Sequence, residues 1–374
     1  MEITSNKMKK NLKNNPHRIA LIIGTRPEII KMSPIIRECV KRGLDYFIIH
    51  SNQHYSEKLD TIFFNELNLP KPKYNLEIGS GRHGEITGKM LIKIEDILLK
   101  EGPNIVLVQG DTNTVLSGGL AAKKLNIPVG HIEAGLRSND QTMPEEINRI
   151  VVDHLATFLF CPTPLTQKNL LKENLSKSSV YITGNTVVDA LFQNFKIAEK
   201  KSLILSTLEI KPLKYILTTV HRQENVDNKK KLVSIVNGLE KLSLKLRLPV
   251  ILPSHPRFIK MLQQFSIKTG PDIKLIDPVG YLDFLILEKN ARIIATDSGG
   301  VQEEACVLGT PCITLRENTE RPETVTVGAN LVAGTNVQSI LKSANKILKN
   351  KRKWKNPFGK GDAAKKIIDI VTKK

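Results

Sequence analysis

Acidic side chains stand at three successive strand-to-helix junctions in one stretch of the chain, and carboxylates in such places can move protons. Asp111 ends the apolar run NIVLVQGD, and Glu133 ends PVGHIE. Glu145 or Glu146 opens the helix that follows. In an open parallel sheet, junctions of this kind share the carboxyl edge, where ligands bind. A helix cap explains any one of these acids more simply, but three in succession beside His131 predict one wall of an active site.

A second set of residues is suited to hold a phosphate group. Ser298, Gly299 and Gly300 follow the apolar run RIIAT and open a helix. Small residues at a helix start expose backbone N–H groups, and the helix dipole there favours an anion. Glu304, one turn further, is placed to accept from ribose hydroxyls, and Arg321 adds a cation near the same edge. This segment predicts a diphosphate site.

Basic and imidazole side chains follow other apolar runs. Arg26 and Lys31, in GTRPEIIK, can hold phosphate as charged donors, although a surface ion pair with Glu28 explains them equally well. His221 and His255 end two runs in the second half, and a pKa near 6.5 makes either a proton carrier or a phosphate donor. For His255, a buried and hydrogen-bonded ring is an equal alternative. The G-x-G-x-x-G fingerprint is absent, which argues against a nicotinamide dehydrogenase.

Short apolar runs alternate with longer helix-patterned segments, and these runs must position the polar residues. The runs are nearly continuous rather than alternating, which is typical of strands buried on both faces of a parallel sheet. The expected strands are residues 19–24, 45–51, 104–110, 128–135, 158–163, 180–185, 215–222, 249–256, 273–279, 292–298 and 311–316.

The chain of 374 residues is long enough for two domains of ordinary size. The strand series pauses after Val187 and restarts at Tyr215, so we expect two doubly wound α/β domains with a cleft between them. The predicted boundaries are a solvated basic tail at 1–17, domains at 18–187 and 215–350, a linker region at 188–214, and a C-terminal helix at 351–374.

Composition narrows the class of protein. The net charge is +19, but aromatic residues make up only 5% and the basic residues are spread over most helices, so we expect no nucleic-acid partner. No apolar run is long enough to span a bilayer and no signal core follows the basic N terminus, so we expect a cytoplasmic protein with no membrane contact. The four cysteines lie in apolar segments without C-x-x-C spacing, which predicts reduced core thiols and no metal site.

Taken together, the motifs resemble the non-hydrolysing UDP-N-acetylglucosamine 2-epimerases. The matching pieces cover about residues 19–348 and read GTRPEIIKMSP, NQHYSE, QGDTNT, GHIEAGLRS, MPEEINR, ITGNTVVD, TVHRQEN, DSGGVQEE and TERPETV. The resemblance implies two Rossmann-like domains of the glycosyltransferase-B type, a homodimer and no dissociable cofactor. It also implies a UDP-sugar substrate.

The resemblance assigns roles by motif. It makes Asp111, Glu133, Glu145 and His221 the catalytic group, with His221 near the leaving phosphate. Glu304 would bind the ribose, and Gln53 and His54 would serve a regulatory site. The other residues assigned to substrate binding are Arg26, Lys31, Arg137, Phe284, Ser298, Gly299, Gly300 and Arg321, with the uracil near Val279 and Phe284.

The implied reaction is reversible inversion at C2 of UDP-N-acetylglucosamine (UDP-GlcNAc) to give UDP-N-acetylmannosamine (UDP-ManNAc). UDP leaves by anti elimination, a 2-acetamidoglucal forms, and UDP adds back. A hydrolysing relative that releases free ManNAc and UDP is the nearest alternative. A glycosyltransferase of the same fold is a second, because fold alone does not set function. A sugar-nucleotide-binding or nucleic-acid-binding protein without turnover is a third, and lack of any exchange or product would leave only a binding or transferase role.

Overall fold

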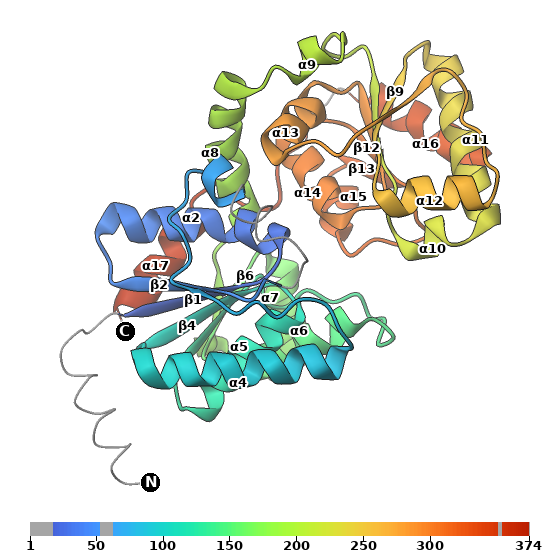
Figure 1. Ribbon diagram of the computed structural model, residues 1–374. Coiled ribbons are helices and arrows are strands. Elements are labelled where there is room, and N and C mark those ends of the chain that lie inside the picture. Colours follow the sequence, from blue (N-terminus) through green and yellow to red (C-terminus); the bar gives the residue numbers. More distant parts are fainter. Residues whose placement is uncertain (1–17, 53–62, 351–353, 374) are drawn as a thin grey trace, which may run out of the picture. The chain divides into compact units, whose positions relative to one another are not determined.

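The structure is a computed structural model that describes residues 18–52, 63–350 and 354–373 (Figure 1). The chain divides into two compact units, one formed by Met1–Ala190 with Phe358–Lys374 and the other by Leu191–Pro357. Each unit is built around one parallel sheet with helices on its faces, the architecture expected from alternating strands and helices. The fold class predicted from the sequence, two doubly wound α/β domains of the glycosyltransferase-B type, is confirmed.

The first unit holds a seven-stranded sheet in the order β3-β2-β1-β4-β5-β6-β7. Every pair of neighbouring strands is parallel. The order reverses between β1 and β4, which makes their carboxyl ends the topological switch point. The strands are β1 (Ile19–Ile23), β2 (Tyr46–His50), β3 (Tyr74–Asn75), β4 (Ile105–Gln109), β5 (Val129–Ile132), β6 (Phe158–Cys161) and β7 (Val180–Ile182).

Helices cover the first sheet and close its core. The strands β1 and β4 are buried along their whole length, and the apolar faces of α4 and α5 pack against that side of the sheet. Left-handed glycines end two of the helices, Gly43 after α2 and Gly102 after α4, as is common at helix ends. The helices are α2 (Arg26–Arg42), α4 (His83–Glu101), α5 (Asn113–Lys124), α6 (Pro144–Leu155), α7 (Pro164–Lys172), the 3-10 turn η1 (Lys177–Ser179), α8 (Thr186–Lys201) and α17 (Ala363–Lys373).

The second unit holds a six-stranded parallel sheet in the order β10-β9-β8-β11-β12-β13. Its switch point therefore lies between β8 and β11. The strands are β8 (Ile216–Thr219), β9 (Val250–Pro253), β10 (Ile273–Ile276), β11 (Ile293–Thr296), β12 (Cys312–Thr314) and β13 (Asn330–Val332).

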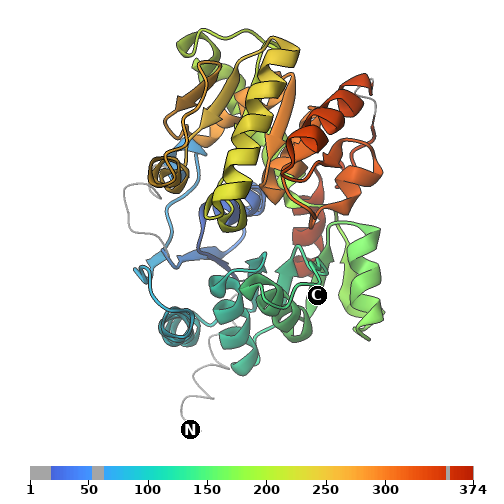
Figure 2. The same cartoon turned by 90° about the vertical axis from the view of Figure 1, so that its right-hand side faces the viewer.

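Figure 2 shows two of the longer helices of this unit, α11 and α16, side by side against the sheet, where they share one apolar core. The helices are α9 (Ile204–Thr207), α10 (Gln223–Val226), α11 (Lys229–Leu246), α12 (Pro256–Gln264), α13 (Tyr281–Asn290), α14 (Gly299–Leu308), α15 (Pro322–Thr326) and α16 (Val337–Lys349).

All eleven strands expected from the sequence are present, and two more exist. The two that sequence reasoning missed, β3 and β13, are two and three residues long and lie at sheet edges. Strands this short contain no apolar run of the length that indicates a strand, so their pairing depends on the neighbouring strand.

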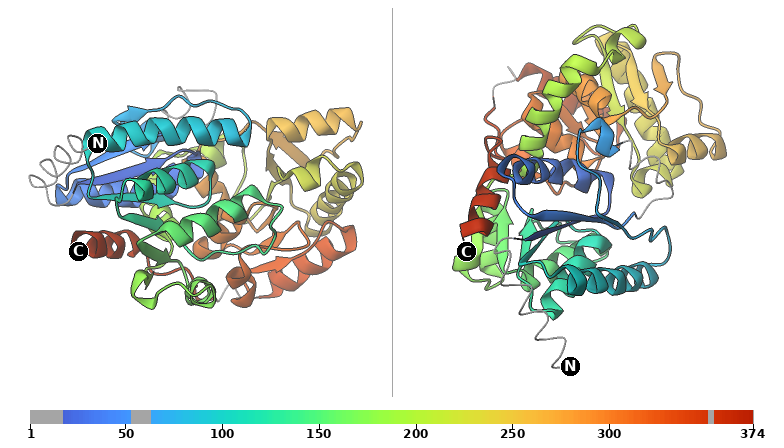
Figure 3. Two further views of the ribbon diagram at one scale, coloured as in Figure 1. Left: turned by 90° about the horizontal axis from the view of Figure 1, so that it is seen from below. Right: turned by 60° about the vertical axis from the view of Figure 1, so that its left-hand side comes forward.

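The C-terminal helix returns to the first unit, where it packs beside α2 (Figure 3). Arg42 of α2 forms an ion pair with Asp369 at 2.7 Å. The buried carboxylate of Asp189 accepts from the N–H groups of Ala363 and Ala364 at 3.2 and 3.0 Å, which caps α17. The segment expected to be a linker, residues 188–214, contains all of α8 except its first two residues, and the short helix α9.

No helix in the described part of the chain is long and apolar enough to cross a membrane. All four cysteines are buried and free of disulfides, as predicted.

Candidate active site

The predicted functional residues gather at the switch points of the two sheets. In the first unit, the turn Gly24–Arg26 follows β1, Asp111 follows β4, and Glu133 follows β5. In the second unit, His221 follows β8 and Ser298–Gly300 follow β11. Carboxyl ends of strands at a switch point are where ligands bind in open α/β sheets. Each unit therefore carries its own group of candidate residues, and the two groups are described in turn.

Glu133 is held in an unusual conformation at the end of β5. Its φ is 74°, a left-handed value that costs energy for any residue but glycine, and such residues cluster at active sites. Both oxygens of its buried carboxylate accept from Lys31 Nζ, at 2.9 and 2.7 Å, and one also accepts from Gln109 Nε2. Lys31 comes from α2 and Gln109 from β4, so one carboxylate joins three elements at the switch point.

Asp111 is anchored through a chain of ion pairs. Arg149 donates from Nη2 to Asp111 and from Nη1 to Glu146, the latter at 2.7 Å. Glu146 is buried and also accepts from the N–H groups of Ser138 and Asn139, at 2.9 and 3.0 Å. Glu146 therefore fixes the loop before α6 and keeps Arg149 beside Asp111.

The two acids that the sequence left as alternatives have different environments. Glu145 is exposed on the first turn of α6, whereas Glu146 is buried within that loop network. Glu146 already accepts from two backbone N–H groups of the loop and from Arg149, which gives it a structural role that Glu145 does not have. The geometry favours Glu145 as the third member of the acidic wall.

A buried imidazole supports the backbone beside Asp111. His131 Nδ1 lies 2.7 Å from Asp153 and Nε2 lies 2.8 Å from the carbonyl oxygen of Gly110. Both partners are acceptors, so both ring nitrogens carry protons. Burial lowers the pKa of His131, but the Asp153 carboxylate and the Gly110 carbonyl outweigh it and raise that pKa above its ordinary value.

Arg137 belongs to the same network. Its guanidinium donates to Asp153 at 2.7 Å and to both oxygens of Glu173 at 2.7 and 2.6 Å, and its side chain is 7% exposed. The sequence placed Arg137 among the substrate-binding residues. The structure instead commits its guanidinium to Asp153, the partner of His131.

The turn after β1 is fixed by a second buried carboxyl group, Glu28. It accepts from the N–H groups of Gly24 and Thr25 and from Thr112 Oγ1, the last at 2.5 Å. Burial raises the pKa of Glu28 to about 7, although the Thr112 hydrogen bond opposes this. The alternative of a surface ion pair between Arg26 and Glu28 is wrong, because Glu28 is buried and Arg26 is exposed.

Glycine is required at the end of β1 by close packing. A Cβ on Gly24 would lie 2.1 Å from Thr114 Oγ1 and 2.6 Å from Ser51 Oγ. The guanidinium of Arg26, which is exposed, lies 5.5 Å from the ring of Phe63 in a cation–π contact. Gln53 and His54, assigned to a regulatory site, lie outside the described residues.

In the second unit, Asp297 orients His221. The buried Asp297 carboxylate accepts from His221 Nδ1 at 3.1 Å and from the backbone N–H of His221 at 3.1 and 3.2 Å. It also accepts from the N–H of Arg222 and from Asn225 Nδ2. Burial raises the pKa of Asp297, but the His221 contact and the other hydrogen bonds outweigh it and hold that pKa below its ordinary value. Nδ1 is therefore the nitrogen that donates to Asp297, and the ring as a whole is 43% exposed.

Sequence reasoning placed Asp297 in the helix-start motif and missed this role. His221 and Asp297 are 76 residues apart, and only the pairing of β8 with β11 brings them together. Nothing in the local sequence indicates such a contact.

The helix start after β11 keeps the open geometry expected of an anion site. Ser298 occupies the N-cap position of α14 without a capping hydrogen bond from its side chain, and Gly299 and Gly300 have no atom closer than 3.6 Å to where a Cβ would lie. About one turn into this helix, Glu304 accepts from the hydroxyl of Tyr281 at 3.2 Å. Arg321, predicted as a phosphate ligand, lies 2.8 Å from the buried Glu303.

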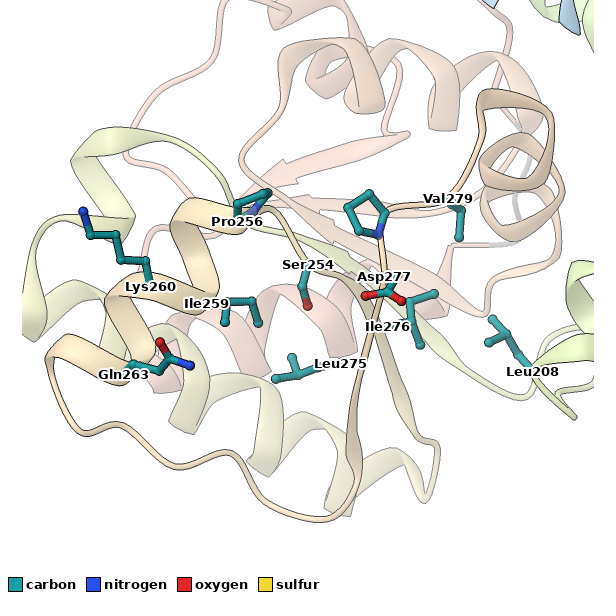
Figure 4. Close-up of a pocket in the computed structure, with 11 residues that line it drawn as sticks. Leu208, Ser254, Pro256, Ile259, Lys260, Gln263, Leu275, Ile276, Asp277 and Val279 are labelled. Carbon is teal, nitrogen blue, oxygen red and sulfur yellow. The ribbon is translucent and has the colours of Figure 1, made fainter. Parts of the chain in front are cut away.

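The predicted uracil residues lie near α13 and the end of β10. Phe284 is half-buried on α13, and Val279 lines a cavity of about 900 Å³ beside α12 and β10 (Figure 4).

His255 is exposed rather than buried, and its Nδ1 accepts from the N–H of Arg257 at 3.2 Å. Burial, with help from His221 and Arg257, lowers the pKa of His255.

Comparison with known proteins places the chain among sugar-nucleotide epimerases. A family model described as UDP-N-acetylglucosamine 2-epimerase matches residues 37–372. The UDP-N-acetylglucosamine 2-epimerase of Methanocaldococcus jannaschii is 55% identical over 361 residues, which are 95% of this chain and 99% of that protein. A protein of the same name from Methanococcus maripaludis is also 55% identical over 361 residues, or 95% and 98% of the two chains.

Solved structures agree with the sequence comparison. A crystal structure of the M. jannaschii UDP-GlcNAc 2-epimerase in complex with UDP-GlcNAc and UDP superposes with a TM-score of 0.88. It is 55% identical and covers 96% of this chain and 100% of that chain.

A double substitution tests whether Lys31 and Glu133 interact. Lys31→Met leaves a buried carboxylate without its counter-charge, which should lower the free energy of unfolding by about 3 kcal/mol. Adding Glu133→Gln removes that charge and should recover most of the loss. Urea unfolding followed by circular dichroism measures both values. Additive losses in the double variant would contradict the pairing, because independent residues show no coupling.

Proposed function

This chain belongs to the UDP-N-acetylglucosamine 2-epimerase family, and we propose that it is the isomerase that interconverts UDP-GlcNAc and UDP-ManNAc without hydrolysis. The observation that carries the proposal is the division of residues between the units. The first unit presents Asp111, Glu133 and Glu145 for proton transfer. The second presents the His221–Asp297 pair and the start of α14 for a diphosphate.

The order of bond breaking follows from the chemistry of the sugar. The hydrogen on C2 is not acidic while the C1–O bond to UDP is intact. Loss of UDP builds oxocarbenium character at C1, which acidifies that hydrogen. Donors aimed at the departing β-phosphate stabilise this step, and such electrostatic stabilisation is usually the largest contribution to catalysis. We assign it to the N–H groups of Gly299 and Gly300, to His221 Nε2, and to Arg26 and Arg321.

Inversion then requires proton transfer on both faces of C2. A carboxylate removes the C2 proton, the C–H electron pair forms the C1=C2 bond, and UDP carries away the C1–O electron pair. Reprotonation of the 2-acetamidoglucal from the opposite face, with return of UDP to C1, gives the epimer. Glu133 is suited to act as a base because Lys31 favours its ionised form. Asp111 and Glu145 supply the further proton-handling groups.

Residues of the second unit bind the rest of the substrate in this proposal. Glu304 is the acceptor for ribose hydroxyls, Ser298 occupies the N-cap position of the phosphate-binding helix, and Phe284 offers an apolar surface to the uracil ring. Lys31 contributes a positive charge beside Glu133. The reaction as written needs no dissociable cofactor.

Proton NMR in deuterated water tests the proposal. Purified protein with UDP-GlcNAc should give UDP-ManNAc, with deuterium at C2 of both sugar nucleotides. Free ManNAc and UDP would identify the hydrolysing alternative. No exchange and no product at high substrate concentration would contradict any epimerase activity.

The same assay tests the residues. Asp111→Asn, Glu133→Gln and His221→Asn should each lower turnover by roughly 10² to 10⁴, the range that general acid–base groups contribute. Asp272→Asn, which changes an exposed carboxylate away from both switch points, should leave turnover unchanged. A wild-type rate in any of the first three would remove that residue from the site.

We further propose that two copies of the chain associate through α4 and α6, with α5 between them (Figure 1). Ile92 and Leu99 are 63% and 48% exposed and lie seven residues apart on α4. Ile147 and Val151, four residues apart on α6, are 53% and 38% exposed. Apolar residues at these spacings share one face of a helix, and contiguous exposed apolar patches mark interfaces.

Sedimentation equilibrium checks this association. The wild-type chain should sediment as a dimer, and the double variant Ile92→Glu with Ile147→Glu as a monomer, because two charges would be buried at the contact. Leu244→Glu, on α11 of the other unit and 67% exposed, is the matched control and should remain dimeric. A monomeric wild-type chain would refute the association.

A further inference from the structure

A buried ion pair lies beside the start of α14, in the loop that follows β12. Arg316, two residues after β12, donates from Nη1 and Nη2 to the two oxygens of Glu320 at 2.8 and 2.9 Å. Both residues are buried, and the remaining donor of Arg316, Nε, reaches Glu224 of α10 at 2.9 Å. A guanidinium that binds both oxygens of a carboxylate fixes its orientation as well as its charge.

The Glu320 carboxylate stands close to the proposed diphosphate site. Its Oε2 lies 3.6 Å from the position that a Cβ on Gly299 would take, and Gly299 is the first residue of α14. A carboxylate in this place repels an anionic ligand. Its own oxygens can also accept from the backbone N–H groups that the ligand needs. A Glu320 without its counter-charge would therefore weaken the binding of a diphosphate.

Arg316 is the main source of compensating charge for Glu320. Burial raises the pKa of Glu320, but the hydrogen bonds and the charge of Arg316 outweigh burial and lower that pKa to about 2. Arg222 adds a smaller attraction. The guanidinium of Arg321, the next residue in the chain, is paired with the buried Glu303 at 2.8 Å. Glu320 is therefore ionised at neutral pH, and Arg316 is the cation that contacts both of its oxygens.

The loop that carries Glu320 has contacts with α14 that do not involve Arg316. Thr319 Oγ1 donates to Gln302 Oε1 at 2.5 Å, and the Arg321–Glu303 pair follows directly. A change that removes only the charge of Arg316 should therefore leave the loop in place.

We propose that Arg316 is a positioning residue that holds Glu320 away from the N–H groups at the start of α14 and cancels its charge, so that the diphosphate of the UDP-sugar binds there. The inference rests on the proposed function for the place of the diphosphate. Arg316 acts through Glu320, so its effect on affinity should vanish once Glu320 is neutral.

Calorimetry with UDP at pH 8 tests this dependence. Arg316→Gln keeps an amide that can donate to Glu320 but removes the charge, so the dissociation constant of UDP should rise about tenfold. Glu320→Gln should bind UDP at least as tightly as wild type. The double variant should return to within about threefold of wild type, because it contains no uncompensated acid. An undiminished loss in the double variant, or no loss in Arg316→Gln, would overturn the proposal.

Uridine and a second arginine provide the controls. Uridine has no phosphate, so its dissociation constant should be the same for wild type and Arg316→Gln. Arg42→Gln breaks ion pairs with Glu38 and Asp369 in the first unit and should leave the affinity for UDP unchanged. Equal losses of UDP and uridine affinity in Arg316→Gln would mean that the loop has lost its structure, and they would overturn the proposal.

A milder variant covers the case in which Arg316→Gln does not fold, as judged by circular dichroism. Arg316→Lys keeps a positive charge for the buried Glu320, but a single ammonium group cannot match both oxygens as a guanidinium does. The dissociation constant of UDP should rise about threefold, and adding Glu320→Gln should restore it. A loss that Glu320→Gln does not restore would count against the role of Arg316.

The turnover assay separates this inference from the proposed function. A wild-type chain that binds UDP but forms no UDP-ManNAc would refute the proposed function and leave the effect of Arg316 on UDP binding intact. An active wild-type chain whose affinity for UDP is the same in Arg316→Gln would refute only the role of Arg316.

Discussion

The ion pair between Lys31 and Glu133 is the interaction on which the acidic group depends. Glu133 sits in left-handed backbone at the end of β5, and both of its oxygens are bound by a lysine from α2. Without that cation, a buried carboxylate in a strained conformation would be costly to keep ionised. With it, α2, β4 and β5 are tied together at the point where the strand order reverses. The strained acid is therefore held where a ligand of an α/β sheet binds.

The second unit also has a buried carboxylate at its switch point that is held by donors from other elements. Buried Asp297 gathers the backbone N–H groups of His221 and Arg222 together with the His221 ring. One carboxylate thus joins the loop after β8 to the helix start after β11. In both units a buried acid at the switch point is satisfied by donors from a neighbouring element, and this fixes the side chains around it.

Sequence reasoning found the sheets and the edge of the site because strand patterns and junctions are local. It did not find how buried side chains pair. Lys31 and Glu133 are 102 residues apart, and no local rule connects them. A surface ion pair with Glu28 stayed open as one of two equal alternatives for Arg26 and Lys31, because the motif GTRPE shows charge but not burial. The substrate-binding role that the resemblance gives Arg137 stays a prediction, and the sequence did not indicate that Arg137 pairs with Asp153 and Glu173. Ion pairs between residues far apart in the sequence can be identified only once the fold is known.

The central claim is that C2 is inverted by breaking and remaking the C1–O bond to UDP. Positional isotope exchange tests it most directly. UDP-GlcNAc carrying oxygen-18 in the bridge between C1 and the β-phosphorus is incubated with the protein, and the label is located by phosphorus NMR. Cleavage frees the β-phosphate to rotate before UDP returns, so the account predicts that the label moves into non-bridging positions as UDP-ManNAc forms. Epimerisation with the label still in the bridge would contradict the account.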